Sequence, residues 1–425
     1  MKLEAKDYEN YIEILKAELV PAMGCTEPIA LAYGAAKARS VLGAIPDKVE
    51  VKVSGNIIKN VKSVVVPNTG ELKGIEAAVS AGIVAGKEDL ILEVLSKTDD
   101  EDKKHIKEFL SQIPIKVTPA DTEEIFDIWL TLSAGDDEVT LRIAKYHTNI
   151  VYIMKNDEVL LDVYNAGDDE EDDSTDRLGM TVEKILEFIE NVELDKIYPM
   201  IYRQIETNMA IAQKGMENPY GANIGKVLLK NGGDTVASKA RAMAASGSDA
   251  RMSGCEMPVI IVSGSGNQGM TASIPVIVYA KELNVSEEKM IRAVALSDLL
   301  TVHLKTGIGR LSAYCGAISA GCSSGAAISW LYGGGYKGIT HTLVNALAIV
   351  SGIVCDGAKP SCAAKIASAV DAGILGHQMF LEGQQFRGGD GIIKKGVEAT
   401  IDNVSRLGSQ GMKETDKEII KIMTC

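Results

Sequence analysis

The spacing of hydrophobic and polar residues changes along the chain and predicts helices followed by a sheet. Residues 1–45 have the apolar spacing of amphipathic helices, interrupted at Pro21, and Thr26 is a suitable N-cap for the second helix. Lys48 to Val53 then alternates strictly between polar and apolar side chains, which is typical of a strand with one buried face. The secondary structure is therefore expected to change at Pro46.

Residues 46–175 predict an α+β module. Two segments have helical spacing, at 72–85 and 101–113, and residues 61–66 are rich in β-branched side chains. Strands are predicted at 90–95, 115–117, 125–132, 138–144, 149–154 and 159–164, with a hairpin turn at 155–157. The acidic run 167–173 is expected to be a solvated loop at the end of the module, and metal binding is its less favoured alternative.

The remainder of the chain predicts mainly helices. From Thr181 onward Ala, Gly and Ser are abundant, and Pro258–Val262 is the clear strand candidate. Small residues let helices approach closely, so tight helix packing is expected. The predicted fold class is α+β: residues 1–45 and 176–425 form a mainly helical domain, into which residues 46–175 are inserted.

Composition and charge exclude several classes of partner. Lys and Arg number 44 against 58 Asp and Glu, so the net charge is −14, and we expect neither nucleic acid nor an anionic membrane as a partner. The longest apolar stretch, residues 343–355, is too short to span a bilayer, and the N-terminus lacks the apolar segment of a signal peptide. We therefore expect a cytoplasmic protein. The sequence leaves its oligomeric state open, a homo-oligomer included.

Seven cysteines, without signs of secretion, are expected to be reduced thiols or metal-bound thiolates. Four of them form two C-x6-C pairs, Cys315/Cys322 and Cys355/Cys362. Neither pair has the spacing of a common zinc site or of a ferredoxin. The Gly- and Pro-containing loop of the second pair could present two sulfurs to one metal centre. The spacing alone equally allows small, buried, structural cysteines.

Cys25 stands just before a predicted helix N-terminus. The positive end of the helix dipole favours a thiolate there, which suits a base, a nucleophile or a metal ligand. A buried cysteine in a turn is the alternative interpretation.

Several motifs in one order resemble the L-cysteine desulfidase family, which is related to the iron–sulfur L-serine dehydratase α-chain. The motifs are Pro21-Ala-Met-Gly-Cys-Thr-Glu-Pro28, His147-Thr-Asn-Ile150, Asp249-Ala-Arg-Met252, Ser263-Gly-Ser-Gly-Asn-Gln-Gly269 and Cys355-Asp-Gly-Ala-Lys-Pro-Ser-Cys362. The likeness runs over nearly the whole chain.

The resemblance implies a lyase that converts L-cysteine to pyruvate, ammonia and sulfide without pyridoxal phosphate. It also implies a [4Fe-4S] cluster held by Cys315, Cys355 and Cys362, with one iron left open, and it places the active-site cysteine at Cys25. Cys322 and Cys255 lie outside this pattern and are expected in the core. The final Cys425 is not clearly the capping element of the related dehydratases.

This chemistry needs a soft Lewis acid for the leaving sulfur, a base for the α-proton and donors for the carboxylate. Cys25 is the first candidate for the base, and it could instead ligate the open iron when substrate is absent. The Gly-rich loop could form a nest of N–H groups, so the expected substrate-binding residues are Ser263, Ser265, Asn267, Gln268, Asn56, Lys59, His147 and Asn149. Arg251 could pair with a carboxylate, but an internal salt bridge with Asp249 or another acid is the favoured explanation.

Other functions remain open on sequence alone. A serine or threonine dehydratase would use the same cluster on a hydroxyl group. A redox or oxygen-sensing iron–sulfur protein would need four cysteine ligands and no substrate site, and a structural zinc protein would need a single-ion site. The loop 263–269 also satisfies G-x-G-x-x-G, but the following segments lack the βαβ arrangement of a dinucleotide-binding fold.

Overall fold

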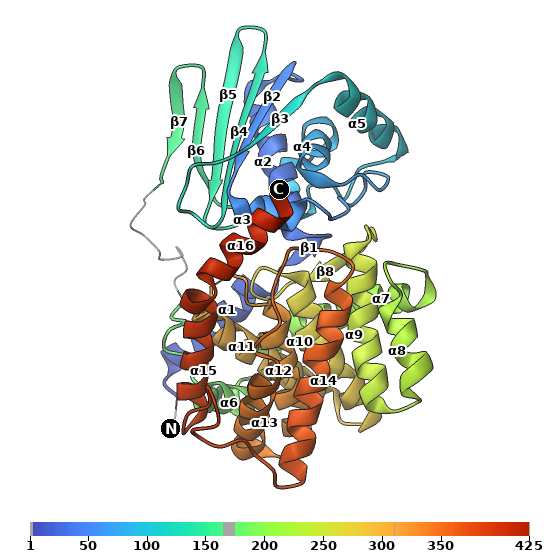
Figure 1. The fold of residues 1–425 in the computed structure, drawn as a ribbon, viewed down its shortest axis with the longest axis vertical. Helices are drawn as coiled ribbons and strands as arrows, with labels where there is room; N and C mark the ends of the chain where they lie inside the picture. Colours follow the sequence, from blue (N-terminus) through green and yellow to red (C-terminus); the bar gives the residue numbers. More distant parts are fainter. Residues whose placement is uncertain (1–2, 165–174, 310, 425) are drawn as a thin grey trace.

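The computed structural model describes residues 3–164, 175–309 and 311–424. It is an α+β structure, mainly helical, as the sequence predicts (Figure 1). The acidic run 167–173 and Cys425 lie outside the described residues, so their expected roles stay predictions. None of the helices formed by the described residues combines the length and hydrophobicity that a membrane crossing requires.

One part of the molecule is built on a six-stranded sheet with the order β3-β2-β4-β5-β6-β7. The first pair, β2 and β3, is parallel, and every other neighbouring pair is antiparallel. The strands are β2 (Lys48–Val53), β3 (Ile115–Pro119), β4 (Asp127–Ala134), β5 (Asp137–Ala144), β6 (Ile150–Lys155) and β7 (Glu158–Asp162). Alternating residues of β2 are buried, such as Val49 and Val51, which is the pattern that predicted this strand.

The helices of this part are α2 (Thr26–Leu42), α3 (Gly55–Val61), α4 (Gly74–Ala85) and α5 (Asp100–Gln112), with the 3₁₀ helix η1 (Glu88–Glu93). Helix α2 lies against the sheet and against α4. A Cβ atom on Gly34 would be 2.8 Å from Leu130 of β4, so this glycine permits the close approach. Helix α2 therefore packs within the sheet-bearing part. The predicted domain division instead groups it, with the rest of residues 1–45, in the helical domain.

The larger part is a body of packed helices. It contains α1 (Ala5–Glu18), α6 (Val182–Asn191), α7 (Leu194–Glu217), α8 (Ile224–Gly232), α9 (Val236–Met252), α10 (Gly266–Glu282), α11 (Glu287–Thr306), α12 (Gly316–Leu331), α13 (Gly335–Val350), α14 (Cys362–Leu381) and α15 (Val397–Arg406). The short strands β1 (Pro21–Met23) and β8 (Pro258–Ile260) pair antiparallel within it. Helices α12 and α14 touch backbone to backbone, because a Cβ on Gly373 would be 2.2 Å from the carbonyl oxygen of Gly321. The expectation of tight packing by small residues is confirmed here.

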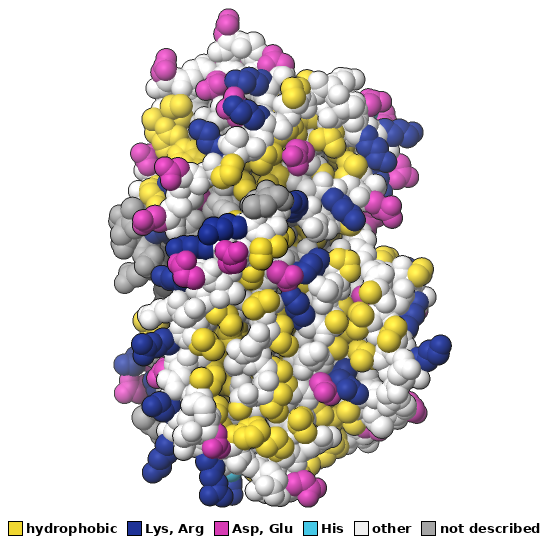
Figure 2. Space-filling view, viewed as in Figure 1, with side chains coloured by type: hydrophobic (Ala, Val, Ile, Leu, Met, Phe, Trp, Pro, Cys, Tyr) yellow, Lys and Arg dark blue, Asp and Glu magenta, His cyan; other side chains and the backbone are white. Residues whose placement is uncertain are grey.

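The chain ends by crossing back to the sheet-bearing part. A π-helical turn, η2 (Leu407–Gly411), leads into α16 (Lys413–Thr424), which packs on α3. A Cβ on Gly55 would be 3.1 Å from Ile420, so the two helices are in direct contact. On the face drawn in Figure 2, acidic and basic side chains are interspersed over α16.

Three local predictions were wrong. Residues 90–95 do not form a strand, because the segment is closed by short-range hydrogen bonds such as Leu90 N–H to Lys87 O (3.0 Å). A short apolar run does not distinguish a strand from a buried turn of helix. Residues 54–60, which the sequence places in a strand–turn region, instead supply the N-cap and most of helix α3. Helix α2 is N-capped by Cys25, one residue before the expected Thr26.

Candidate functional site

One cavity lies where the helical body meets the sheet-bearing part. Its volume is about 110 Å³, enough for several waters or a small molecule. Its walls come from the starts of α2, α12 and α14, the ends of α3 and α9, and the loop before α10. The structure brings together all candidate residues except Asn56 and Asn149; the residues that line the cavity are Cys25, Lys59, His147, Ser263, Ser265, Asn267, Gln268, Cys315, Cys355 and Cys362.

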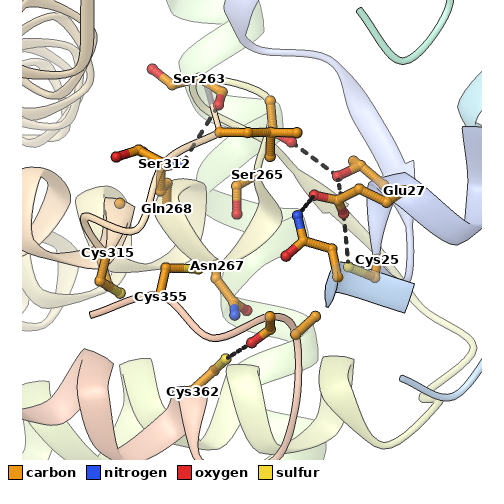
Figure 3. Close-up of a pocket in the computed structure, with 18 of the residues that line it drawn as sticks. Cys25, Glu27, Ser263, Ser265, Asn267, Gln268, Ser312, Cys315, Cys355 and Cys362 are labelled. Atoms are coloured by element: carbon orange, nitrogen blue, oxygen red, sulfur yellow. Dashed lines mark hydrogen bonds between the residues drawn. The ribbon is translucent and has the colours of Figure 1, made fainter. Parts of the chain in front are cut away.

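Three thiols lie on one side of this cavity (Figure 3). Cys315 is the N-cap of α12, Cys362 is the first residue of α14, and Cys355 is in the loop before α14. Backbone hydrogen bonds hold the segments around Cys315 and Cys355 beside each other: Cys315 N–H donates to Ile353 O (3.2 Å), and Cys355 N–H donates to Ala313 O (2.6 Å). The positions of these thiols are therefore set by two helix starts and a two-stranded bridge.

The thiols also influence one another electrostatically. Burial, together with the proximity of Cys355, raises the pKa of the Cys315 thiol to about 12. Burial likewise raises the pKa of Cys362, while the nearby backbone N–H and charge of Lys359 act in the opposite direction. Because their ionised forms repel one another, such a group of thiolates needs a positive centre to hold it together.

Cys25 faces these thiols from the opposite side, next to Glu27 (Figure 3). The Cys25 thiol donates to Glu27 Oε2 across 3.1 Å, and Asn60 Nδ2 donates to Glu27 Oε1 across 3.1 Å. All three side chains are buried. Burial raises the pKa of the Cys25 thiol well above its ordinary value, and the Glu27 charge adds to this shift. Burial and the Glu27 charge therefore oppose the thiolate form that the helix dipole favours at this position.

The Gly-rich loop leads from β8 into α10 and takes a left-handed backbone at Ser263 (φ 48°) and Gly264 (φ 74°). The Ser263 N–H is already used, because it donates to Glu18 Oε2 across 2.6 Å. Further donors at this wall are the N–H groups in the first turn of α10, which have no partners within the helix. Gln268 is buried beside Gly316, where a Cβ would be 2.6 Å from its side chain.

The sheet-bearing part contributes Lys59 and His147 to the cavity. Lys59 is 2% exposed and its Nζ atom lies 2.5 Å from Asp416 Oδ1 of α16. The His147 ring packs edge-on against Phe126, with ring centroids 4.8 Å apart.

Two candidates lie elsewhere. Asn56 is buried on α3 but does not line the cavity, and Asn149 borders a neighbouring cavity of about 660 Å³ together with Tyr146 and Arg177. Cys322 and Cys255 are buried in the hydrophobic core, as expected.

Comparison with known proteins identifies the family. Residues 89–421, well over half of the chain, match the family described as serine dehydratase alpha chain. The chain belongs to this family. The three thiols and the Gly-rich loop lie within the matched region, whereas Cys25, Glu27, Lys59 and Asn60 precede it.

Full-length relatives cover these earlier residues as well. The chain is 62% identical over 425 residues to a UPF0597 protein of Desulfitobacterium hafniense, with 100% of this chain and 98% of the relative aligned. It is 50% identical over 416 residues to a UPF0597 protein of Lachnoclostridium phytofermentans (98% and 99% aligned). A UPF0597 protein of Treponema denticola is 46% identical over 428 residues (100% and 99% aligned).

The chemistry of the donor set in this member of the serine dehydratase alpha chain family fits an iron–sulfur cluster. The three thiols line one cavity without disulfide bonds, and their sulfurs are the soft ligands that iron–sulfur clusters use. Within residues 3–164, 175–309 and 311–424, no three His, Cys, Asp or Glu side chains converge on a point as a single metal ion requires. A cubane cluster does not require this, because each of its thiolates binds a different iron.

Several residues of the cavity were not among the predicted site residues. Glu27 lies inside the motif Pro21–Pro28, where the Cys-x-Glu spacing at a helix start was the available signal, and Asn60 directly follows the predicted Lys59. Arg251 forms no ion pair with Asp249 or with another acid of the described residues; its Nε atom donates to Gly24 O, and Asp249 accepts from Gly225 N–H. Asp416 lies 357 residues from Lys59, and no local pattern connects them.

Proposed function

We propose that this chain is an iron–sulfur-dependent lyase that converts L-cysteine to pyruvate, ammonia and hydrogen sulfide. The observation that carries the proposal is the arrangement of the cavity, with three thiols on one side and the Cys25–Glu27 pair on the other. The family membership supports an elimination from the β-carbon of a small amino acid.

The overall reaction breaks the Cα–H and Cβ–S bonds of the substrate. L-cysteine gives hydrogen sulfide and aminoacrylate, which tautomerises to an imine, and water then hydrolyses the imine to pyruvate and ammonia. The protein must therefore remove one proton and stabilise one departing sulfur, and it needs no external oxidant or reductant.

Cys315, Cys355 and Cys362 are the proposed ligands of a [4Fe-4S] cluster. When bound, the cluster would supply an iron without a protein ligand as a soft Lewis acid for the departing sulfur. Two of these thiols lie at helix N-termini, where the dipole favours the thiolate form that a metal ligand needs.

The Cys25–Glu27 pair is the proposed route for the α-proton. The Cys25 thiol already donates to Glu27 Oε2, so movement of this proton onto the carboxylate leaves a thiolate that can accept the substrate proton. Asn60 and Thr26 donate to the two oxygens of Glu27 and hold the carboxylate in place (3.1 and 3.2 Å). The buried position excludes bulk water, which would otherwise compete for this base.

Dehydration of L-serine, or of L-threonine, is the second candidate, and the family description favours it. Both reactions share the amino-acid end of the substrate and differ in the leaving atom. A thiolate is the softer ligand and leaves as the weaker base, so the proposal for L-cysteine rests on the match between sulfur and iron.

The test is anaerobic incubation of the iron-loaded protein with L-cysteine, L-serine and L-threonine in separate reactions. Sulfide and pyruvate should appear in equal amounts from L-cysteine, and pyruvate or 2-oxobutyrate should form more slowly from the hydroxyl substrates. Cys355→Ala protein, prepared in parallel, is the control for free iron. Faster turnover of L-serine would establish the second candidate instead, and iron-loaded protein that only changes redox state, without product, would exclude both.

A further inference from the structure

Arg251, near the end of α9, is a buried cation that lines the cavity. It is 2% exposed, and its Nε atom donates to the carbonyl oxygen of Gly24 across 2.9 Å. Its Nη2 atom is buried and has no hydrogen-bond partner. A buried guanidinium without an anion is costly, so this position calls for a negatively charged ligand.

The other basic side chains of the cavity are engaged. Lys59 forms an ion pair with Asp416, and the Nζ atom of Lys305 donates to Gly309 O across 2.5 Å. Asp249, two residues before Arg251, accepts from the backbone N–H of Gly225 at 3.3 Å. Arg251 thus combines a full charge with an unused donor.

The first turn of α10 lies directly against this guanidinium. A Cβ atom on Gly266, the first residue of α10, would be 2.6 Å from Arg251 Nε. The early N–H groups of this 17-residue helix carry the positive end of its dipole. An anion beside Arg251 would therefore meet both a guanidinium and a helix N-terminus.

Three other residues that line the same cavity have acceptor atoms without partners. The side-chain oxygens of Asn60, Asn267 and Gln268 are buried and accept no hydrogen bond. The orientation of the Asn60 amide is fixed because its Nδ2 atom donates to Glu27. Unsatisfied buried acceptors are costly, and amide oxygens are suitable partners for an ammonium group.

We propose that Arg251 and the first turn of α10 bind the α-carboxylate of the substrate, and that the amide oxygens of Asn60, Asn267 and Gln268 bind its α-ammonium group. This inference rests on the proposed function and defines the substrate class: a free, zwitterionic α-amino acid with a short side chain, in a cavity of about 110 Å³. The β-substituent of such a ligand is then left to face the three thiols.

Two fragments of L-cysteine separate the halves of this site. 3-Mercaptopropionate keeps the carboxylate and lacks the ammonium group, whereas cysteamine keeps the ammonium group and lacks the carboxylate. Both keep the thiol. Their binding to the iron-loaded protein is measured anaerobically by the shift in thermal midpoint and by inhibition of product formation.

Arg251→Gln should weaken 3-mercaptopropionate binding and raise the KM for L-cysteine by about 10- to 100-fold, as expected for loss of a charge-assisted hydrogen bond. Cysteamine binding should stay within about two-fold, because it does not use this donor. Arg241→Gln is the matched control: Arg241 is on the same helix, pairs with Asp371 near the surface, and does not line the cavity. Equal weakening of both fragments would mean a merely structural role for Arg251 and would overturn the proposal.

A second variant keeps the test decisive if Arg251→Gln does not fold. Asn267→Leu should weaken cysteamine binding and leave 3-mercaptopropionate binding unchanged, and the opposite selectivity would contradict the assignment. Wild-type protein that binds cysteamine as tightly as L-cysteine would also contradict it. Because the thermal shift needs no turnover, carboxylate binding is tested even if the protein fails to cleave L-cysteine, so the two proposals can fail separately.

Discussion

The Nζ atom of Lys59 lies 2.5 Å from Asp416 Oδ1, and this ion pair joins α3 to the C-terminal helix α16. The lysine side chain is 1% exposed and the aspartate side chain 15%. The pair therefore closes one side of the candidate site with residues from distant parts of the chain. Lys59, which the sequence suggested for substrate binding, therefore already has a carboxylate partner within the protein.

Removal of the aspartate charge should destabilise the protein, because it leaves Lys59 buried and unpaired. We expect Asp416→Asn to lower the free energy of unfolding by about 3 kcal/mol. Urea unfolding measures this value. Glu414→Gln is the control: Glu414 is on the same helix and pairs with Lys417 in solvent, so its substitution should leave the free energy of unfolding nearly unchanged. Similar losses of unfolding free energy in the two variants would show that the buried ion pair contributes no more to stability than the exposed one.

The three proposed ligands should be needed for iron. Cys315→Ala, Cys355→Ala and Cys362→Ala should each lose the brown colour and most of the bound iron after anaerobic reconstitution. Cys322→Ala should keep both, because Cys322 is fully buried in the hydrophobic core. Iron content and visible absorption are the measurements. Full iron in any one of the first three variants would remove that residue from the ligand set.

The Cys25–Glu27 pair should be needed for turnover and not for iron. Cys25→Ala should retain the cluster and lose sulfide release, and Glu27→Gln should lower kcat by about 100-fold or more, the usual contribution of a proton-transfer group. Glu76→Gln is the control, because Glu76 is an exposed carboxylate in the first turn of α4. If Cys25→Ala retained full turnover, the proposed proton route would be wrong.

Asp298, on α11, should make stability depend on pH. It is buried, its Oδ1 atom accepts from Gln204 Nε2 (3.0 Å), and its Oδ2 atom has no partner. Burial raises the pKa of this carboxyl well above its ordinary value. Above the ordinary pKa of aspartate the folded protein keeps a proton that the unfolded chain releases, so stability falls as the pH rises, by at most about 1.4 kcal/mol per pH unit.

The contribution of Asp298 can be isolated by substitution. Asp298→Asn should flatten the decline in the free energy of unfolding between the ordinary and the raised pKa, measured by urea unfolding at a series of pH values. Asp402→Asn, at an exposed position of α15, should leave the slope as it is in the wild type. An unchanged slope in Asp298→Asn would contradict the assigned direction of the pKa.

Local periodicity predicted much of the fold, and its failures have physical reasons. The alternation at Lys48–Val53 identifies β2 because every second residue is buried. The helix α3 was missed because Asn56, Ile57 and Ile58 have weak helix propensity, and contacts with α16 outweigh that preference. No pattern within residues 55–61 could show that a helix more than 350 residues away in the sequence packs against them.

The site was predicted where motifs carry the chemistry and missed where packing decides it. The motif cysteines and the loop 263–269 meet in one cavity, as a common function requires. The raised pKa of the Cys25 thiol could not be predicted, because it depends on burial and on the carboxylate of Glu27. That Arg251 has no carboxylate partner could not be predicted either, because Asp249 instead accepts a hydrogen bond from the backbone N–H of Gly225 on α8.

The contact between α12 and α14 has a consequence for the inorganic chemistry of the protein. Cys315 and Cys362 stand at the starts of these two helices, and glycines with no side chain determine how near the helices lie. The distance between these two proposed ligands therefore depends on glycines further along the two helices. A side chain added at position 321, 325 or 373 would push the two helices apart and so change the spacing of the proposed ligands without altering any of them.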